Sequence, residues 1–406
     1  MVSSELISTY DLALDRESKI MLLVIDGVGG LPHPISGRTE LETARTPHLD
    51  ALARSGIGGL SDPIARGIAP GSGVAHLALF GYDPVVHAIG RGAVAALGIG
   101  LKPAPEDLAV RVNFATMNDK GIISDRRAGR IPTERNAELC ALLRPIQLDG
   151  VEFTIDPVKD YRAVVVFKGE DLSEELTDSD PGQNGLPPEP VEPRVPGDPS
   201  AERTARIANT FIRQARDILR ELAPTNAILM RGFAHPVYLP TMQEVYKLKA
   251  GAIATYPDYL GVSRMVGMDI LPTGDAVSDE MVTLEKHYAD YDFIYFHVKK
   301  TDSAGEDGNF NEKVRLIEEV DAFVPRITQL HPDVLVVTGD HSTPATFKAH
   351  SWHPVPLILS GKWARRDAVR AFSETECTKG SLGRFPATEI MALALANAER
   401  LTKFGA

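Results

Sequence analysis

The sequence predicts a mixed α/β fold with a mostly parallel sheet that carries helices on both faces. First, apolar runs of strand length recur along the 406 residues, at 20–26, 226–231, 251–255, 292–298, 333–338 and 355–360. Second, helical patterns follow three of them, at 45–55, 241–247 and 258–267. Third, hydrophobic residues make up 43% of the chain, which is ordinary for a globular protein. Apolar strands that alternate with helices are typical of parallel sheets buried on both faces.

A further helix is predicted at 311–329. Its apolar side chains recur near the 3.6-residue period, at Val314, Ile317, Val320, Phe323 and Val324. This stripe predicts a helix packed on the core, with no binding surface of its own.

The middle of the chain follows another pattern. Strands are predicted at 108–117, 151–157 and 162–168 around one helix at 133–144, a βαββ order. We therefore expect a smaller inserted α+β domain at 103–197, with the core domain formed by 1–102 and 198–406. The proline- and glycine-rich segment 178–199 ends the insertion and is expected to be a linker. An active-site lid or hinge is the alternative, because long loops in compact proteins are often functional.

Composition excludes several classes of protein. The 43 basic and 55 acidic residues give a net charge of -12, which argues against nucleic acid as a partner and leaves small anionic substrates possible. Cys140 and Cys377 form no CxxC pair, so a disulfide framework is not expected and a reducing, cytoplasmic location is. Residues 1–18 lack the features of a signal peptide, and no apolar segment approaches the roughly 20 residues of a membrane span. The sequence does not predict an oligomeric state.

Candidate metal ligands lie in three clusters. Asp26 ends the run 20–26, Asp340 and His341 follow the run 333–338, and Asp302 lies four residues before Glu306. His350 and His353 follow Asp340 and His341 in the sequence. Ligands of open parallel sheets bind at the carboxyl ends of the strands, and mixed oxygen and imidazole donors suit a two-metal hydrolase or phosphotransferase. Taken alone, Asp26 could equally cap a helix or satisfy a turn.

A serine between two glycines is the candidate nucleophile. Ser72 precedes the predicted helical stretch 74–80, whose N-terminus would present N–H groups to an anion. A simple helix cap is the commoner role for a lone Gly-Ser-Gly, and only the metal clusters favour a nucleophile activated by coordination.

Arginines concentrate in the predicted insertion. Arg91 and Arg111 precede a run at 125–130 that holds Asp125, Arg126, Arg127 and Arg130. Guanidinium groups bind phosphate and carboxylate oxygens bidentately, so the cluster suits a small phosphorylated acid. A solvated surface turn is the alternative.

Six segments together resemble a known family. They are LVIDGVGG with Asp26, APGSGVAHLALFGYDP with Ser72, DRRAGRI at 125–131, KKTDSAGEDGN with Asp302, GDHSTP at 339–344 and KAHSWHPVP at 348–356. In this order, from about residue 20 to 400, they resemble the archaeal-type 2,3-bisphosphoglycerate-independent phosphoglycerate mutases of the alkaline phosphatase superfamily. The resemblance implies an alkaline-phosphatase-like sheet and interconversion of 3-phosphoglycerate and 2-phosphoglycerate in glycolysis and gluconeogenesis. It also implies two divalent ions (Mn, Mg, Co or Zn) and no 2,3-bisphosphoglycerate cofactor.

The resemblance also implies site residues. Asp26, Ser72, Asp340 and His341 match the family's first metal set, with Ser72 as the phosphorylated nucleophile. Asp302 and His350 match the second set, because the family's ligand histidine lies four residues before Pro354-Val355-Pro356, a spacing that His353 lacks.

Two positions depart from the family pattern. Glu306 occupies a histidine position of the second metal set and is expected to ligate through oxygen, with preference for a harder ion. Gly73 stands where related sequences often carry aspartate.

The mechanism that the resemblance implies is a two-step transfer, in which Ser72 takes the phosphoryl group and the other glycerate hydroxyl takes it back. The insertion would close over the substrate and exclude water. The residues expected to contact substrate are His76, Arg91, Arg111, Asp125, Arg126, Arg127, Arg130, Lys249, Arg264 and Lys299. His76, His297 or Lys299 would carry the proton between glycerate oxygens. Two alternatives stay open: a related phosphatase or phosphotransferase that acts on another alcohol such as homoserine, and a catalytically silent binding protein.

Overall fold

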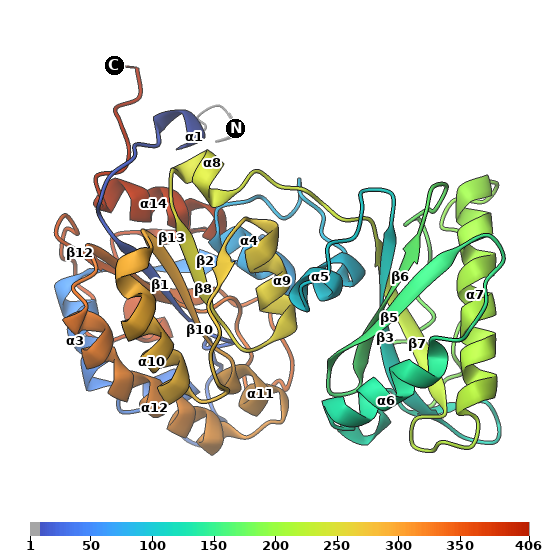
Figure 1. Ribbon diagram of the computed structural model, residues 1–406. Helices are drawn as coiled ribbons and strands as arrows, with labels where there is room; N and C mark the ends of the chain where they lie inside the picture. The colour runs from blue at the N-terminus through green and yellow to red at the C-terminus, as the bar shows by residue number, and fades with distance from the viewer. Residues whose placement is uncertain (1–8, 406) are drawn as a thin grey trace. The chain divides into compact units, whose positions relative to one another are not determined.

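A computed structural model describes residues 9–405, so residues 1–8 and 406 lie outside the description. The chain forms two compact units. The core unit comprises residues 1–88, 239–255 and 266–406, and the inserted unit comprises residues 89–238 and 256–265. Figure 1 shows the elements of both units in chain colours.

An eight-stranded sheet forms the centre of the core unit. Its order is β13-β2-β12-β11-β1-β10-β8-β9, and β12 alone among these strands runs against the others. The strands are β1 (Ile20–Ile25), β2 (Ile57–Asp62), β8 (Ala250–Ile253), β9 (Asp269–Ile270), β10 (Phe293–Val298), β11 (Val334–Thr338), β12 (Val355–Gly361) and β13 (Gly383–Pro386). The predicted mostly parallel α/β sheet is confirmed.

Helices cover both faces of this sheet. Met21, Leu23 and Ile25 of β1 share one hydrophobic cluster with α3 (Pro47–Ser55), α10 (Val277–His287) and α12 (Phe310–Gln329). On the other face, Tyr295 of β10 contacts the rings of His76 and Phe80 at α4 (Ser72–Leu79). The remaining helices of this unit are α1 (Thr9–Leu12), α2 (Glu40–Thr43), α8 (Met242–Tyr246), α11 (Lys300–Glu306), α13 (Glu374–Cys377) and α14 (Ile390–Asn397).

The inserted unit contains a second, antiparallel sheet. Its path is β4-β3-β6-β5, and β7, the fifth strand, pairs antiparallel with β3 off this path. The strands are β3 (Leu108–Met117), β4 (Ile123–Asp125), β5 (Glu152–Lys159), β6 (Arg162–Lys168) and β7 (Ala227–Ala234). Its helices are α5 (Arg91–Gly98), α6 (Thr133–Leu143), α7 (Pro199–Leu219) and α9 (Pro257–Met265). The predicted βαββ order is therefore present. None of the helices described in either unit is long and apolar enough to cross a membrane.

The strand predicted at 226–231 was assigned to the wrong sheet. It is β7, and it pairs antiparallel with β3 in the inserted unit. An apolar run determines that a strand forms, but it does not determine the strand's partner. The inserted unit also extends beyond the expected limits 103–197, because α5, α7, β7 and α9 belong to it.

The proline-rich segment is built into the inserted unit. The Ser179 amide donates to Met230 O at 2.9 Å, and the Gly232 amide donates to the Asp178 carboxylate at 2.7 Å. Val191 of the segment is buried in the hydrophobic core of the unit. The linker expectation is therefore wrong, because the segment has several partners on β7 and α7, among them the Val191 amide, which donates to Asn209 Oδ1 of α7 at 3.0 Å.

Candidate metal centre

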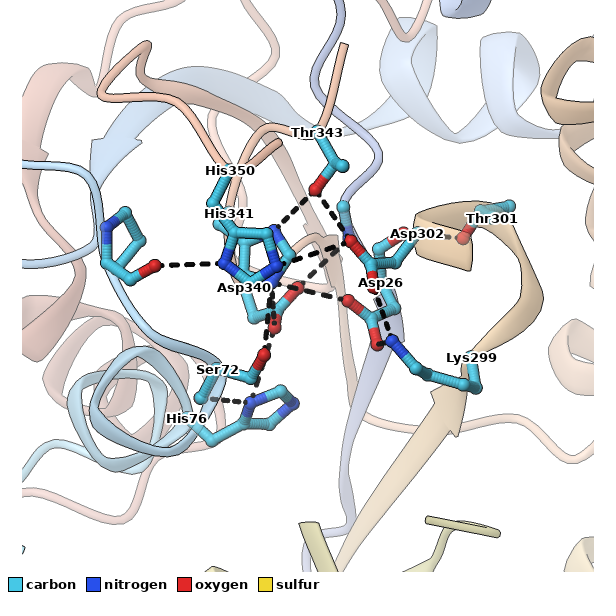
Figure 2. Close-up of polar contacts among 12 residues, drawn as sticks. Asp26, Ser72, His76, Lys299, Thr301, Asp302, Asp340, His341, Thr343 and His350 are labelled. Carbon is cyan, nitrogen blue, oxygen red and sulfur yellow. Dashed lines mark hydrogen bonds and ion pairs between the residues drawn. The ribbon is translucent and has the colours of Figure 1, made fainter. Parts of the chain in front are cut away.

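Three neighbouring parallel strands position the acidic side chains of the site. Asp26 follows β1, Asp340 follows β11, and β10 leads through Lys299 into α11, which carries Asp302. Because parallel strands end at the same edge of a sheet, three segments distant in sequence meet there. Figure 2 shows these side chains pointing toward one another.

The first cluster comprises Asp26, Asp340, His341 and Ser72. His341 Nε2 lies 3.1 Å from Asp340 Oδ2 and 3.5 Å from Asp26 Oδ1, and the ligand atoms of these three residues lie within 4.8 Å of one another. Ser72, the first residue of α4, has its Oγ 3.4 Å from His341 Nε2. The arrangement brings a hydroxyl to the edge of a fully buried carboxylate–imidazole group (Figure 2).

The two carboxylates of the first cluster are charged although they are buried. Burial alone would raise the pKa of Asp340, but His341, His76 and His297 together outweigh burial and hold the pKa well below its usual range. Burial and Asp340 act to raise the pKa of Asp26, yet Lys299 and His297 bring it to about 2. Burial opposes protonation of His341, while Asp340 raises its pKa to about 9. Both carboxylates are therefore ionised at neutral pH.

These residues fit a divalent cation. Asp340 Oδ2 is fully buried and accepts no hydrogen bond among the residues that the structure describes. Buried ionised carboxylates are costly unless a positive charge compensates for them. Carboxylate and imidazole donors together suit Mn, Zn or Co, and carboxylate oxygens also suit Mg.

Asp302, His350 and His341 form a second cluster. His350 Nε2 lies 3.5 Å from Asp302 Oδ1, and the two imidazole rings stack with centroids 3.6 Å apart. His350 Nδ1 is 2.9 Å from Pro70 O, which orients the ring toward the cluster. His353 instead lies 3.0 Å from Ser351 Oγ and stacks on Trp352.

Glu306 lies at the margin of the second cluster. Its Oε1 is 4.0 Å from His350 Nε2, and 42% of its side chain is exposed. The carboxylate is thus near enough to join the donor set through a side-chain rotation, and it is less constrained than Asp302, whose side chain is only 3% exposed.

Lys299 connects the two clusters. Its Nζ lies 3.0 Å from Asp26 Oδ2 and 2.5 Å from Asp302 Oδ2. Burial would lower the pKa of Lys299, but the two carboxylates raise it, so the ammonium form is favoured. His76 and His297 touch the same acids from fully buried positions: His76 Nδ1 is 3.5 Å from Asp340 Oδ2, and His297 Nε2 is 3.3 Å from Asp26 Oδ2.

A second layer of residues that sequence reasoning missed holds the ligand loops. Thr343 Oγ1 donates to Asp302 Oδ1 at 2.7 Å and lies 2.9 Å from His341 Nδ1. Lys313 of α12 is fully buried, and its Nζ donates to Thr343 O at 2.8 Å and to Gly29 O at 3.1 Å. Lys313 lies three residues before Leu316 and four before Ile317, which places it on the apolar side of α12. A lysine at such a position is the only sign of a buried charge that the sequence offers here.

Several predicted arginines gather in the inserted unit. The pKa of Arg91, at the start of α5, is lowered by partial burial and then by the positive charges of Arg231 and Arg111. Arg111 pairs with Asp258 at 3.2 Å. Arg231, on β7, was not anticipated, although its strand was. Three guanidinium groups that repel one another make a candidate binding site for an anion.

The run at 125–130 has structural partners. Arg126 binds both oxygens of Asp180, at 2.6 and 2.8 Å, and Asp180 also lies 3.3 Å from Arg231. The Asp125 carboxylate accepts the amides of Arg127 and Gly129 and thereby shapes the turn. Arg127 and Arg130 are exposed. The side chains of Arg126 and Asp125 are therefore bound to other groups of the inserted unit, whereas the sequence led us to expect that they contact the substrate.

Two weaker candidates lie elsewhere. Lys249 precedes β8 at the opposite edge of the core sheet, where its Nζ sits 5.0 Å from the centre of the Tyr291 ring. Arg264 donates at 2.8 Å to the carbonyls of Leu97 and Gly98 and so caps the end of α5. The structure gives both side chains structural roles, contrary to the expectation that they contact substrate.

The fold and donor set define an α/β protein whose sheet ends in a candidate divalent-metal centre. The family described as 2,3-bisphosphoglycerate-independent phosphoglycerate mutase matches residues 53–226. A probable mutase of this name from Thermotoga sp. (strain RQ2) is 50% identical over 397 residues, covering 97% of this chain and 98% of that protein. A relative of the same name from Thermus thermophilus is 48% identical and covers 98% of each chain.

Solved structures agree. A cofactor-independent phosphoglycerate mutase from Thermoplasma acidophilum shares 32% identity and a TM-score of 0.67, over 94% of this chain and all of that one. A Pyrococcus horikoshii protein shares 30% identity and a TM-score of 0.82, over 96% of this chain and 99% of that one. The chain belongs to the 2,3-bisphosphoglycerate-independent phosphoglycerate mutase family, and it is an isomerase of that family.

Proposed function

We propose that the protein interconverts 3-phosphoglycerate and 2-phosphoglycerate through a phosphoserine at Ser72, with two divalent cations and no bisphosphoglycerate cofactor. The observation that carries the proposal is the position of Ser72 Oγ, 3.4 Å from His341 Nε2 at the edge of the buried acidic cluster. Family membership supports the substrate class. The reaction belongs to glycolysis and gluconeogenesis, and the two buried free thiols, Cys140 and Cys377, favour a reducing cytoplasmic location.

The donor sets assign residues to each cation. Asp26, Asp340, His341 and Ser72 would hold the first, and Asp302, His350 and Glu306 would hold the second. Bound divalent cations at such positions supply positive charge that favours ionisation of a nearby hydroxyl and offsets the charge of a transferring phosphoryl group. Thr343 and Lys313 hold together the loops after β1 and β11, which carry ligand residues.

In the proposed transfer, Ser72 Oγ loses its proton and forms a bond to phosphorus while the bond from phosphorus to one glycerate oxygen breaks, and that oxygen takes a proton. The second glycerate hydroxyl then loses its proton and accepts the phosphoryl group, which restores the serine. His76, His297 and Lys299 are the candidates for the proton carrier, and Lys299 is the one with an exposed part, 20% of its side chain, whereas His76 and His297 are fully buried. The anionic groups of the substrate need cationic partners, and Arg91, Arg111 and Arg231 are the favoured ones.

An enolase-coupled assay tests the proposal. It is run with Mn, Mg, Co and Zn, with and without 2,3-bisphosphoglycerate, beside a measurement of released inorganic phosphate. Wild type should turn over without the bisphosphate and become labelled by ³²P-phosphoglycerate. Ser72→Ala should lose both turnover and label, whereas Ser303→Ala, an exposed serine on α11, should retain both. Turnover by Ser72→Ala would refute the serine mechanism, and phosphate release without mutase product would favour a phosphatase.

A further inference from the structure

The inserted unit contains a cavity that is unrelated to the arginines described above. The turn after β3 and the last turns of α7 line a surface cavity, open to solvent, with a volume of about 510 Å³. Ligand pockets for small molecules are typically ~300–1,000 Å³. The cavity is lined by Met117, Asn118, Asp119, Asn209, Ile212, Arg213, Arg216, Asp217, Arg220 and Asn226.

Three arginines at the end of α7 form one wall: Arg213 and Arg216 lie within the helix, and Arg220 is the residue that caps its C-terminus. Arg213, Arg216 and Arg220 are spaced by three and four residues, so they lie along one side of the helix. At 1.5 Å per residue the row extends roughly 10 Å. The opposite side of α7, with Phe211, Ala215 and Leu219, is buried in the core of the unit. Packing therefore fixes which side of the helix faces the cavity.

The positive charge of this wall is only partly neutralised. Arg220 pairs with Asp217 at 3.1 Å, whereas within residues 9–405 the Arg213 side chain donates only to the neutral Thr210 hydroxyl, at 3.3 Å. Arg216 has no hydrogen bond or ion pair from its side chain to any residue that the structure describes. This wall is therefore locally positive, although the chain as a whole has a net charge of -12. Guanidinium groups in such a row suit phosphate oxygens.

The other walls are held in place by side-chain amides. Asn226 accepts from the Met117 amide and donates to the Met117 carbonyl, both at 2.8 Å. Asn209 makes the equivalent pair with Val191, at 3.0 and 2.8 Å. Asn118 Oδ1 accepts the amides of Lys120 and Ile122 and fixes the turn. The cavity is thus shaped before any ligand arrives, which lowers the cost of binding.

The walls differ in chemistry. Asp119, on the turn, is exposed and can accept hydrogen bonds from hydroxyl groups, while Met117 and Ile212 add apolar surface. We propose that this cavity binds a small phosphate ester that also bears free hydroxyl groups, with the phosphate at Arg213 and Arg216 and the hydroxyls toward Asp119. A nucleotide and a sugar phosphate share this chemistry.

Calorimetry on the full-length protein tests the site. The probes are ADP and glucose 6-phosphate, with adenosine, glucose and inorganic phosphate for comparison. At least one phosphate ester should bind, and Arg216→Glu should weaken it by at least about tenfold, because a charge-assisted contact becomes repulsive. Arg206→Glu is the matched control: it makes the same charge change at an exposed position of α7 outside the cavity lining, and it should bind like wild type.

The outcomes separate the possible ligands. Binding of ADP alone identifies a nucleotide site, and binding of glucose 6-phosphate alone identifies a sugar-phosphate site. If neither ester binds, if inorganic phosphate binds as tightly as the esters, or if Arg216→Glu and Arg206→Glu weaken binding equally, the proposal is wrong. A thermal melt equal to that of wild type establishes that Arg216→Glu is folded. Binding at any other phosphate site would be insensitive to Arg216.

Discussion

Lys313 offers the sharpest test of how the metal centre is supported. Its buried ammonium group connects the loop after β1, through Gly29 O, to the loop after β11, through Thr343 O. Substitution by methionine keeps the length of the side chain and removes its donors and charge. Burial lowers the pKa of Lys313, while Glu40 and Glu374 raise it, so these acidic groups also lose a compensating neighbour.

The cost follows from the contacts. Lys313→Met deletes two charge-assisted hydrogen bonds and leaves two carbonyl groups with fewer donors, each bond being worth about 1.5–3 kcal/mol. Removing one member of a buried charged network typically costs ~3–5 kcal/mol. We therefore expect a loss of about 4 kcal/mol in the stability of the core unit, together with weaker metal binding, because the two ligand loops lose their common anchor.

Urea unfolding followed by tryptophan fluorescence measures this loss. Both tryptophans, Trp352 and Trp363, belong to the core unit, so the signal reports that unit. Arg315→Met is the control, because Arg315 lies two residues away on α12 and pairs with Glu312 and Glu319 at the surface. Metal affinity is measured in parallel by calorimetry. A Lys313→Met midpoint that matches the Arg315→Met midpoint, with unchanged metal affinity, would refute the anchor.

Two other substitutions test charge at defined positions. Burial raises the pKa of Glu280 on α10 to about 8, so between pH 4.5 and 8 the folded state keeps a proton that the unfolded state releases, and stability falls as pH rises. Glu280→Gln should remove this slope and gain on the order of 4 kcal/mol at pH 9 over wild type, but not at pH 4, in urea titrations. Glu285→Gln, at an exposed position on the same helix, should not reproduce the gain. For the metal centre, Glu306→His should raise the affinity for Zn and lower that for Mg, each by roughly tenfold in calorimetry, because imidazole replaces oxygen. Unchanged preference would show that Glu306 does not ligate.

The strands that lead to the ligands could be predicted from the sequence because each is a mainly apolar run, with an acid one to four residues after its end. β2 and β13 escaped prediction for a physical reason. A side chain at Gly59 of β2 would meet Gly383 O at 2.8 Å, so the close approach of β13 requires glycine, and glycine weakens the strand pattern. The sequence also does not show which strands pair with one another, and β7 was therefore predicted in the wrong sheet.

The residues of the candidate site likewise include some that the sequence predicts and some that it does not. Asp26, Ser72, Asp302, Asp340, His341 and His350 could be selected from strand ends and family motifs, and the structure brings them together. Thr343 and Arg231 could not, because each acts through a tertiary contact that local sequence does not encode, and for Lys313 the sequence shows only a lysine on the apolar side of a helix, without its partners. Asp125, Arg126 and Arg264 show the opposite error: residue types suited to anions were chosen, although their contacts are internal.

The chain separation within the first cluster has a consequence for synthesis on the ribosome. The Gly27 amide bonds to Asp340 across 313 residues of sequence. A nascent chain therefore holds Asp26 and Ser72 long before the strand that completes their surroundings exists, and no metal centre of this kind can form until β11 has emerged. Residues 89–238 of the inserted unit are continuous and can fold in the interval. Under the proposed function, metal capture is thus a late event, and a chain that stops before residue 340 carries Ser72 without the Asp340 and His341 side chains that lie beside it in the folded protein.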